Sequence, residues 1–340
     1  MGGTTLCTKE AASSKSWVEK CIGDPSVKNL QYLLSLKALR KNNEKVDIAM
    51  FEGFAKQKIK VSETEINLVT GGNGPPLLLM HGYPQSHVMW HKVAPSLAES
   101  FTLVMPDLRG YGDSGLPQPD DQHYNYSKRA TARDQTEVME ALGYSEFMVC
   151  GHDRGGRVAH RMALDYPEKI LKLCVLDIVP TYRIFEDADK DLATKYWHWF
   201  FLIQRHPVPE TMIANSLEFY LRTQFGSWGH GVDTITEEAF GEYLRCFKRP
   251  GVLYATCEDY RAGASIDLVH DKVDLAKKIS CPVLALWGAF GAMHNRYDVI
   301  AIWRERALNV QGRAIKSGHF IPEEAPGDII EQLSEFFLGN

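Results

Sequence analysis

An aspartate stands at the centre of a glycine-rich turn, Gly151-His152-Asp153-Arg154-Gly155, which follows the apolar run FMVC and precedes a helical run. Glycines allow a sharp, strained turn from strand to helix that presents the central side chain. Acyl transfer to Asp153 would give a high-energy anhydride, whereas displacement of a leaving group from saturated carbon gives an ester that water can cleave. The alternative is that Asp153 only caps the following helix.

Cleavage of such an ester needs a base for the water and donors for the oxyanion. The motif SGHF at 317–320 follows the last expected strand and offers His319 as the base. The motif HGYP at 81–84 follows the run PPLLLM, so the backbone N–H groups of Tyr83 and Arg154 are the expected oxyanion donors. Because the chain has 12 histidines, a loop histidine is the alternative for His319, and an ordinary turn is the alternative for 81–84.

A third group has to orient the base, and two acids compete for this role. Asp177 ends the apolar run that follows the helix after the glycine-rich turn. Asp298 follows the run LALWG, which is the more common place for such an acid, but it lies ten residues beyond Gly288. We therefore favour Asp177, and Asp298 remains the alternative.

Strand-like and helix-like runs alternate from about residue 51, which predicts a parallel, doubly wound α/β sheet. The expected strands lie within 56–74 (two strands), 75–80, 101–107, 147–153, 172–180, 281–288 and 312–317. The expected helices are 91–100, 126–143, 154–169, 297–308 and 327–339. The alternation places the nucleophile, the oxyanion donors and the base in loops that follow strands.

The alternation is interrupted between residues 181 and 270, where the chain is helical and rich in aromatic residues. We expect an α/β core of residues 51–180 and 271–340, with 181–270 inserted as a helical cap. Residues 1–50 differ in composition and hold one amphipathic run at 29–43, which predicts an N-terminal extension of unknown role.

Composition excludes several classes of protein. The chain has 38 Lys plus Arg against 43 Asp plus Glu, a net charge of −5, so nucleic-acid binding is not expected. No apolar run approaches the roughly 18 residues that a membrane-spanning helix needs. Seven scattered cysteines without a C-x-x-C pair indicate neither disulfides nor zinc, and we expect a cytoplasmic protein.

No metal and no cofactor are expected, although two short patterns invite them. His87 and His91 have the i, i+4 spacing of zinc ligands, but the segment lacks the glutamate of H-E-x-x-H and no third ligand is evident. The pattern G-x-G-x-x-G at 110–115 follows an expected strand, but LPQPDDQ comes next in place of the helix that a dinucleotide site needs.

Seven motifs together resemble the fluoroacetate (haloacetate) dehalogenases of the α/β-hydrolase superfamily, over about residues 51–338. They are HGYPQ at 81–85, DLRGYGDS at 107–114, GHDRGGR at 151–157, LDIVPT at 176–181, YWHW at 196–199, CEDYRAG at 257–263 and SGHF at 317–320. GHD-x-GG alone is shared with epoxide hydrolases and haloalkane dehalogenases. The arginine pair and the cap motifs are more specific. The N-terminal extension and the loop 289–298 depart from the family pattern.

The resemblance implies a role for each residue that matches a family motif. Asp153 would be the nucleophile, His319 the base and Asp177 its partner. The residues expected to hold the substrate carboxylate are Arg154 and Arg157. The residues expected to hold the leaving halide are His198, Trp199 and Tyr260. Guanidinium groups suit a carboxylate, and N–H or O–H donors suit a halide.

The same resemblance implies a homodimer formed through the cap, with a small anionic halogenated acid and water as substrates. The alternatives without a functional role are a solvent-exposed helix face for Arg157 and hydrophobic packing for the aromatic residues of the cap, above all for Trp197. Trp228 is a further candidate for the pocket wall. The preferred halide, the enantiopreference and the natural substrate stay open.

Two other functions compete with dehalogenation. An epoxide hydrolase would use the same Asp-His-Asp set, and cap tyrosines such as Tyr220 and Tyr260 would protonate the alkoxide. A non-catalytic binding protein of the same fold would have a broken triad, whereas all three members are present here.

Overall fold

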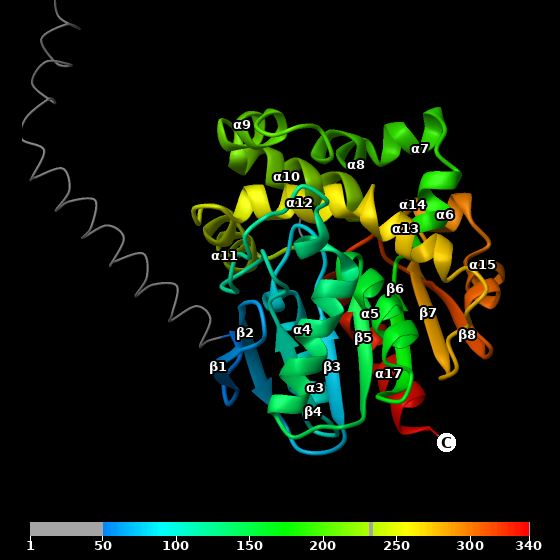
Figure 1. The fold of residues 1–340 in the computed structure, drawn as a ribbon. Helices are drawn as coiled ribbons and strands as arrows, with labels where there is room; N and C mark the ends of the chain where they lie inside the picture. Colours follow the sequence, from blue (N-terminus) through cyan, green and yellow to red (C-terminus); the bar gives the residue numbers. More distant parts are fainter. Residues whose placement is uncertain (1–49, 231–233, 340) are drawn as a thin grey trace, which may run out of the picture. The chain divides into compact units, whose positions relative to one another are not determined.

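The computed structural model describes residues 50–230 and 234–339, and its centre is an eight-stranded sheet (Figure 1). The strand order is β1-β2-β4-β3-β5-β6-β7-β8. The strands are β1 (Ala55–Lys60), β2 (Glu65–Gly71), β3 (Pro76–Met80), β4 (Thr102–Pro106), β5 (Phe147–His152), β6 (Ile170–Leu176), β7 (Val283–Gly288) and β8 (Val310–Ile315). Each overlaps a stretch that the sequence predicted, although β1, β6 and β8 begin one or two residues earlier than expected.

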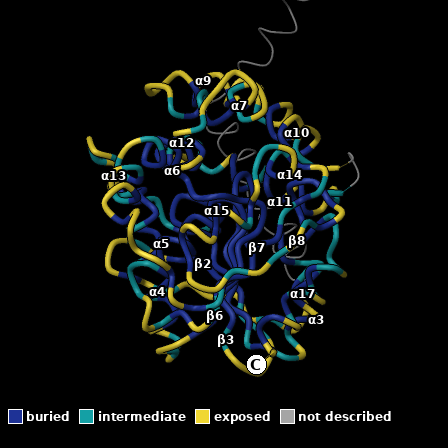
Figure 2. Tube along the Cα trace, turned by 90° about the vertical axis from the view of Figure 1, so that its right-hand side faces the viewer, coloured by how far each residue is buried: buried dark blue, intermediate teal, exposed yellow. Residues whose placement is uncertain are grey.

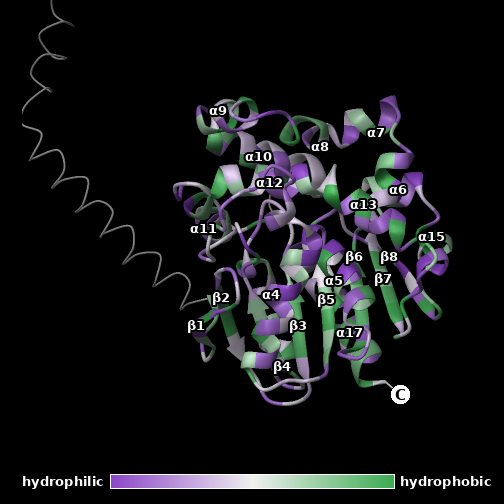
Figure 3. Cartoon of the chain, in the orientation of Figure 1, coloured by the Kyte–Doolittle hydropathy of each residue, from purple (hydrophilic) through white to green (hydrophobic). Residues whose placement is uncertain are grey.

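The sheet is mostly parallel. The first strand pairs antiparallel with β2 and β2 with β4, and every later neighbour pairs in parallel. Central strands of such sheets are covered on both faces and therefore consist of continuous apolar runs. Leu77, Leu78, Leu79 and Met80 of β3 are fully buried. Figure 3 shows the hydrophobic colour concentrated on these strands, and Figure 2 shows the centre of the molecule buried.

Helices cover both faces of the sheet, as a doubly wound fold requires. Helices α4 (Lys128–Ala141) and α5 (Arg154–Asp165) pack on one face, and α3 (Ala94–Leu97) and α17 (Pro326–Leu338) lie together on the other (Figure 2). The helix expected over 91–100 is shorter: α3 covers only four residues, with a proline in its first turn, and the 3-10 turn η1 (His87–Trp90) lies before it. Helix α15 (Val299–Arg306) follows β7.

In the described residues between β6 and β7, eight helices form the helical insert (Figure 1). They are α6 (Thr181–Glu186), α7 (Lys190–Lys195), α8 (Trp197–Leu202), α9 (Val208–Ala214), α10 (Leu217–Trp228), α11 (Glu237–Phe247), α12 (Val252–Gly263) and α13 (Ile266–Val273). The boundary expected at residue 270 falls inside α13. No strand is found in the described part of this insert, as its sequence suggested.

Two short helices fall in loops that the sequence did not resolve. Helix α14 (Ala292–Arg296) lies within the loop 289–298, and α16 (Ile321–Glu324) follows the SGHF motif. The 3-10 turn η2 (Tyr124–Tyr126) precedes α4.

The strand order sets where a site can form. The chain leaves β3 towards β4 on one side and then returns to β5 on the other side. At such a switch point the loops after the two strands diverge and leave a crevice at their carboxyl ends. The motif HGYP follows β3 and Asp153 follows β5, so both lie at this crevice. Asp177 follows the adjacent strand β6.

The predicted N-terminal extension and its amphipathic run at 29–43 lie outside the described residues. Residues Met50–Asn340 form one unit. Among the helices that the structure describes, none is both long enough and apolar enough to cross a bilayer.

Gly155 allows α5 to start against the end of β3, and this contact gives the first prediction. A Cβ on Gly155 would lie 2.5 Å from the Met80 carbonyl oxygen, which is too close for any real contact. We expect Gly155→Ala to lower the free energy of unfolding by about 1–3 kcal/mol in urea denaturation. Gly241→Ala, in the exposed face of α11 with open space around it, is the control and should be neutral or stabilising. Equal stability of the two variants would contradict the prediction.

Candidate active site

Asp153 occupies the strained bend between β5 and α5, with φ 46° and ψ −112°. Its side chain makes no capping hydrogen bond to the helix, so the alternative that Asp153 serves only as a helix N-cap does not hold. The carboxylate is 6 % exposed, and its Oδ1 accepts a 3.0 Å hydrogen bond from the Tyr83 backbone N–H. Gly82 permits this contact, because a Cβ there would lie 2.5 Å from the Asp153 Cβ.

The surroundings keep the buried carboxylate ionised. Burial alone would raise the pKa of Asp153, but the nearby charges of His319 and Arg157, with smaller effects of His152 and Arg154, lower this pKa to about 2. A carboxylate that is ionised and poorly hydrated is a competent nucleophile at neutral pH.

His319 and Asp177 form a hydrogen-bonded pair. The His319 Nδ1 lies 2.6 Å from the Asp177 Oδ2, and the Gly288 N–H donates to the Asp177 Oδ1 at 3.0 Å. Burial opposes the charge of His319, but the hydrogen bond and charge of Asp177 outweigh it and raise the pKa of His319. With Nδ1 held by Asp177, the other ring nitrogen is left to take a proton.

The competing acid lies elsewhere. Asp298 accepts a hydrogen bond from the Ala301 N–H at 3.0 Å and caps the first turn of α15. Asp177 lies next to Gly291, where a Cβ would be 3.6 Å from its Oδ1. Of the two acids that the sequence left open, Asp177 is therefore the one in contact with His319.

The two arginines after Asp153 are both buried but differ in their partners. The Arg154 Nε donates to the Asp259 Oδ2 at 2.6 Å, and its Nη2 donates to the Asp259 carbonyl at 2.7 Å. Arg157 forms no ion pair with any described residue. Its Nη1 donates to the Val179 carbonyl at 3.0 Å, and its Nε is buried without a hydrogen-bond partner. Burial lowers the pKa of Arg157, and the charge of Asp153 opposes this effect.

No described carboxylate forms an ion pair with this buried guanidinium, and the charge of Asp153 offsets the effect of burial only in part, so the Arg157 site is suited to an anionic ligand. The guanidinium of Arg157 lies 4.6 Å from the Trp199 ring centroid, and that of Arg154 lies 4.2 Å from the Tyr260 ring centroid. Arg157 therefore faces the site and does not lie on a solvated helix face.

The three predicted halide ligands are buried and lie together on α8 and α12 of the insert. The rings of His198 and Tyr260 are 5.9 Å apart, and those of Trp199 and Tyr260 are 6.1 Å apart. The His198 Nδ1 and the Trp199 Nε1 are buried, and neither has a hydrogen-bond partner among the residues that the structure describes. Burial holds the pKa of His198 well below its ordinary value, so this imidazole is neutral.

Other aromatic side chains enclose the same space. Trp228 lies 4.2 Å from the His198 ring and 5.7 Å from the His319 ring, so it walls the site as the sequence suggested. The Tyr83 hydroxyl donates to the Tyr220 hydroxyl at 2.9 Å. Trp197 is 38 % exposed and packs against Phe201 and Tyr220, in line with its interpretation as a packing residue.

Sequence reasoning missed several buried polar residues around the site. The His152 Nε2 donates to the His319 carbonyl at 2.7 Å, and burial lowers the pKa of His152 to about 3. Glu323 accepts hydrogen bonds from Gln85 and Tyr243, and burial raises its pKa to about 8. Asp259 belongs to the CEDYRAG motif but was not predicted as a site residue, whereas its neighbour Tyr260 was.

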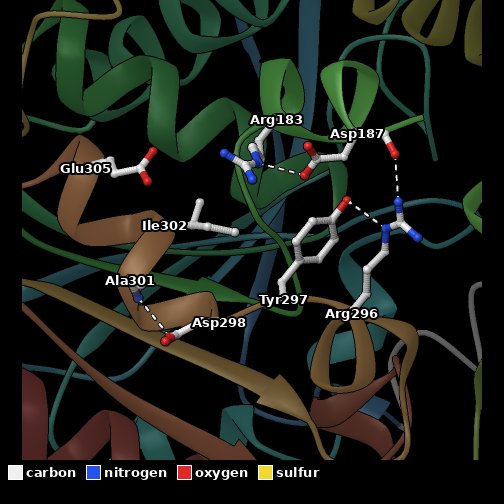
Figure 4. Close-up of a pocket in the computed structure, with 8 residues that line it drawn as sticks. All are labelled: Arg183, Asp187, Arg296, Tyr297, Asp298, Ala301, Ile302 and Glu305. Carbon is white, nitrogen blue, oxygen red and sulfur yellow. Dashed lines mark hydrogen bonds and ion pairs between the residues drawn. The ribbon is translucent and has the colours of Figure 1, made fainter. Parts of the chain in front are cut away.

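Two hollows on the described part of the molecule lie away from the nucleophile. One of about 390 Å³ lies between α6 and α15 and has charged walls, including Arg183, Asp187 and Arg296 (Figure 4). It contains Asp298 but no other predicted site residue. A second, of about 510 Å³, borders α12 and includes His123 and Arg261. The reacting groups are instead enclosed between the strand ends and the insert.

The arrangement can carry out a two-step substitution at saturated carbon. It provides an ionised carboxylate, a base paired with an acid, two backbone N–H donors and a buried cation. Arg154 begins α5, so its N–H has no partner within the helix and adds to that of Tyr83.

Residues 75–326 match the family described as the alpha/beta hydrolase fold, and the chain belongs to this family. Within it, the chain is 45 % identical over 288 residues to a fluoroacetate dehalogenase of Burkholderia sp, covering 84 % of this chain and 95 % of the relative. It is 35 % identical over 279 residues to a soluble epoxide hydrolase of Corynebacterium sp. (strain C12), covering 80 % and 93 %.

Solved structures of the same fold are also similar to this chain. One from Nostoc sp PCC 7120, described in general terms as an α/β hydrolase, has a TM-score of 0.84 and 53 % identity, covering 84 % of this chain and 99 % of its own. An epoxide hydrolase structure without ligand has a TM-score of 0.78 and 32 % identity, covering 84 % and 99 %.

The hydrogen bond between Asp177 and His319 predicts how the imidazole titrates. A base must be unprotonated, so a raised pKa means that base function is lost as the pH falls through that raised value. We expect the pKa of His319, measured by NMR on labelled histidine, to lie above its ordinary value of about 6.5 and to fall below it in Asp177→Asn. Asp298→Asn is the matched control and should leave the titration unchanged. A shift in the control instead would reverse the assignment of the acid.

Proposed function

We propose that the protein is a hydrolytic dehalogenase that cleaves the carbon–halogen bond of fluoroacetate and related small 2-halo acids. The observation that carries the proposal is the buried Arg157 guanidinium, which has no carboxylate partner among the described residues and lies one helical turn from Asp153. A small acid would supply the missing negative charge. The 45 % identity to a fluoroacetate dehalogenase supports this reading.

In the first step, Arg154 and Arg157 hold the substrate carboxylate, and Asp153 attacks the carbon that bears the halogen. Because the Tyr83 N–H binds Oδ1, Oδ2 is the oxygen free to attack. The new bond joins Oδ2 to carbon, and the halide leaves with the electron pair of the broken bond. His198, Trp199 and Tyr260 stabilise its developing charge, which lowers the barrier because fluoride is a poor leaving group.

In the second step, His319 takes a proton from water, and the water oxygen attacks the Asp153 Cγ. Tyr83 and Arg154 donate their backbone N–H groups to the oxyanion, while Asp177 stabilises the imidazolium. Collapse breaks the ester bond, and the leaving oxygen of the 2-hydroxy acid takes the proton from His319. The second proton of the water remains on the acid so formed at Asp153 and passes to solvent, which restores the Asp153 carboxylate.

The proposal is tested by incubating the protein with fluoro-, chloro- and bromoacetate beside a simple epoxide, and by measuring halide, glycolate and diol. We expect halide and glycolate in equal amounts. Absence of halide from all three acids would overturn the proposal.

The second candidate function is epoxide hydrolysis by the same triad. The Tyr260 ring lies 5.2 Å from that of Tyr83, whose hydroxyl bonds to Tyr220, so tyrosine hydroxyls are available to protonate an alkoxide. The 35 % identity to an epoxide hydrolase favours it too. Diol without halide in the same panel would decide for this function.

We also propose a homodimer that associates through the insert, in the cytoplasm. Exposed apolar side chains on α9 and α10, notably Met212 and Phe219, support the dimer. The described cysteines are buried and unpaired, in keeping with a reducing compartment. Sedimentation equilibrium tests the homodimer, and cell fractionation tests the cytoplasmic location.

His319→Asn is expected to stop the reaction after the first step. The variant keeps Asp153 and the arginines but lacks the base, so the ester should accumulate. Mass spectrometry should then find a carboxymethyl group on the peptide that carries Asp153 after incubation with a haloacetate. The double variant with Asp153→Asn is the control and should carry no adduct. Normal turnover by His319→Asn would exclude this base.

Arg157→Met is expected to lower kcat/KM for chloroacetate by about 100-fold or more, because a charge-assisted contact to the carboxylate is lost. A neutral substrate such as a small epoxide should be affected far less. Equal losses on both substrates would show that Arg157 does not bind the carboxylate.

A further inference from the structure

Arg154 belongs to a buried row of alternating charges that reaches away from the site. Asp259 on α12 pairs with Arg154 on one side and with the Lys128 Nζ on the other. The Lys128 Nζ lies 3.6 Å from the Asp267 Oδ2, and the Lys128 backbone N–H donates to the Asp267 Oδ1 at 2.8 Å. All four residues are buried, so their charges interact through little water.

The contacts of Asp259 fix the orientation of the arginine. Its Oδ2 accepts from the Arg154 Nε at 2.6 Å and from the Tyr111 hydroxyl at 2.8 Å, while its carbonyl accepts from Nη2. Its other oxygen, Oδ1, binds the Lys128 Nζ. Among the described residues, no hydrogen bond engages the Arg154 Nη1, so this is the atom left for a ligand.

The charge balance depends on the lysine. Arg154 and Asp259 alone are a neutral pair, and a neutral pair attracts a carboxylate weakly. Lys128 is a second cation paired with Asp259, so it balances part of the aspartate's negative charge. Asp259 therefore cancels less of the positive field of Arg154, and the remainder can attract an anion. Both cations, after the opposing effect of burial, hold the pKa of Asp259 well below its ordinary value.

We propose that Lys128 is a positioning residue for the carboxylate site, acting through Asp259 on the orientation and effective charge of Arg154. The inference rests on the proposed role of Arg154 in binding the acid. Lys128 does not touch the substrate: it stands at the start of α4, and Asp259 lies between it and Arg154. A purely structural role for this lysine makes a different prediction, because it would tie α4 to α12 and α13 without affecting ligand affinity.

The experiment measures the dissociation constant of acetate by calorimetry. Acetate has the carboxylate of the substrate and no leaving group, so its binding does not depend on turnover. Lys128→Met should raise the dissociation constant for acetate by about tenfold or more, because the charge of Asp259 is then balanced by Arg154 alone and cancels more of its field. Lys128→Arg should restore binding to within a few-fold of wild type.

Two further variants separate positioning from structure. Asp267→Asn removes the outermost negative charge and keeps an oxygen for the Lys128 N–H, so it should leave acetate binding unchanged or tighter. Arg161→Met is the matched control, because Arg161 is an equally buried cation on α5 that pairs with Asp274 at 2.7 Å. It should lower stability and leave acetate affinity within about twofold of wild type.

Each outcome decides. Weaker binding in Lys128→Met, with rescue by arginine and no loss in Asp267→Asn or Arg161→Met, supports the inference. Unchanged affinity in Lys128→Met, or equal losses in all three non-conservative variants, overturns it, as does a wild-type protein that binds no acetate. If Lys128→Met does not fold, weaker acetate binding in Asp267→Asn is by itself enough to overturn the inference. Acetate binding without halide release would contradict the proposed function and not this inference.

Discussion

A carboxylate that stays ionised while it is buried is the constraint on which the rest of the site depends. Asp153 is 6 % exposed, yet its pKa is lowered to about 2 by the positive groups around it. Those groups come from different elements: His319 follows β8, and Arg157 lies on α5. The switch point between β3 and β5 brings these loops to one crevice, and the strained bend holds the carboxylate at its centre.

The insert completes this environment by excluding water. His198, Trp199 and Tyr260 approach the strand ends from α8 and α12, and Trp228 contacts His319 from α10. An ionic group in such a space gains strong interactions with fixed donors, because little solvent competes with them. The nitrogens of His198 and Trp199 that find no partner among the described residues cost stability, and they suit a ligand that accepts hydrogen bonds from them.

The fold class was predictable because long apolar runs and turn residues fix the parallel strands, and each strand overlaps its predicted run to within two residues at its start. Asp153, Asp177 and His319 could be expected to lie near one another because each follows a strand. The short helix α14 was missed, since five residues carry too little periodicity. The surroundings of Arg154 were also missed: its partner Asp259 is 105 residues away, Asp259 also pairs with Lys128 131 residues from it, and no local pattern links the three. Charged residues in helices usually face solvent, so only coordinates reveal this buried row.

The unpaired guanidinium of Arg157 has a consequence for the release of the product. If the protein acts as proposed, the hydroxy acid formed by hydrolysis would keep the carboxylate by which the substrate was bound, so the arginines would hold both molecules with similar strength. Selectivity for the halogenated acid would then have to come from the opposite end of the molecule, where a hydroxyl replaces the halogen. Departure of glycolate would leave the Arg157 guanidinium without a carboxylate ligand, which would favour exchange of one anion for the next.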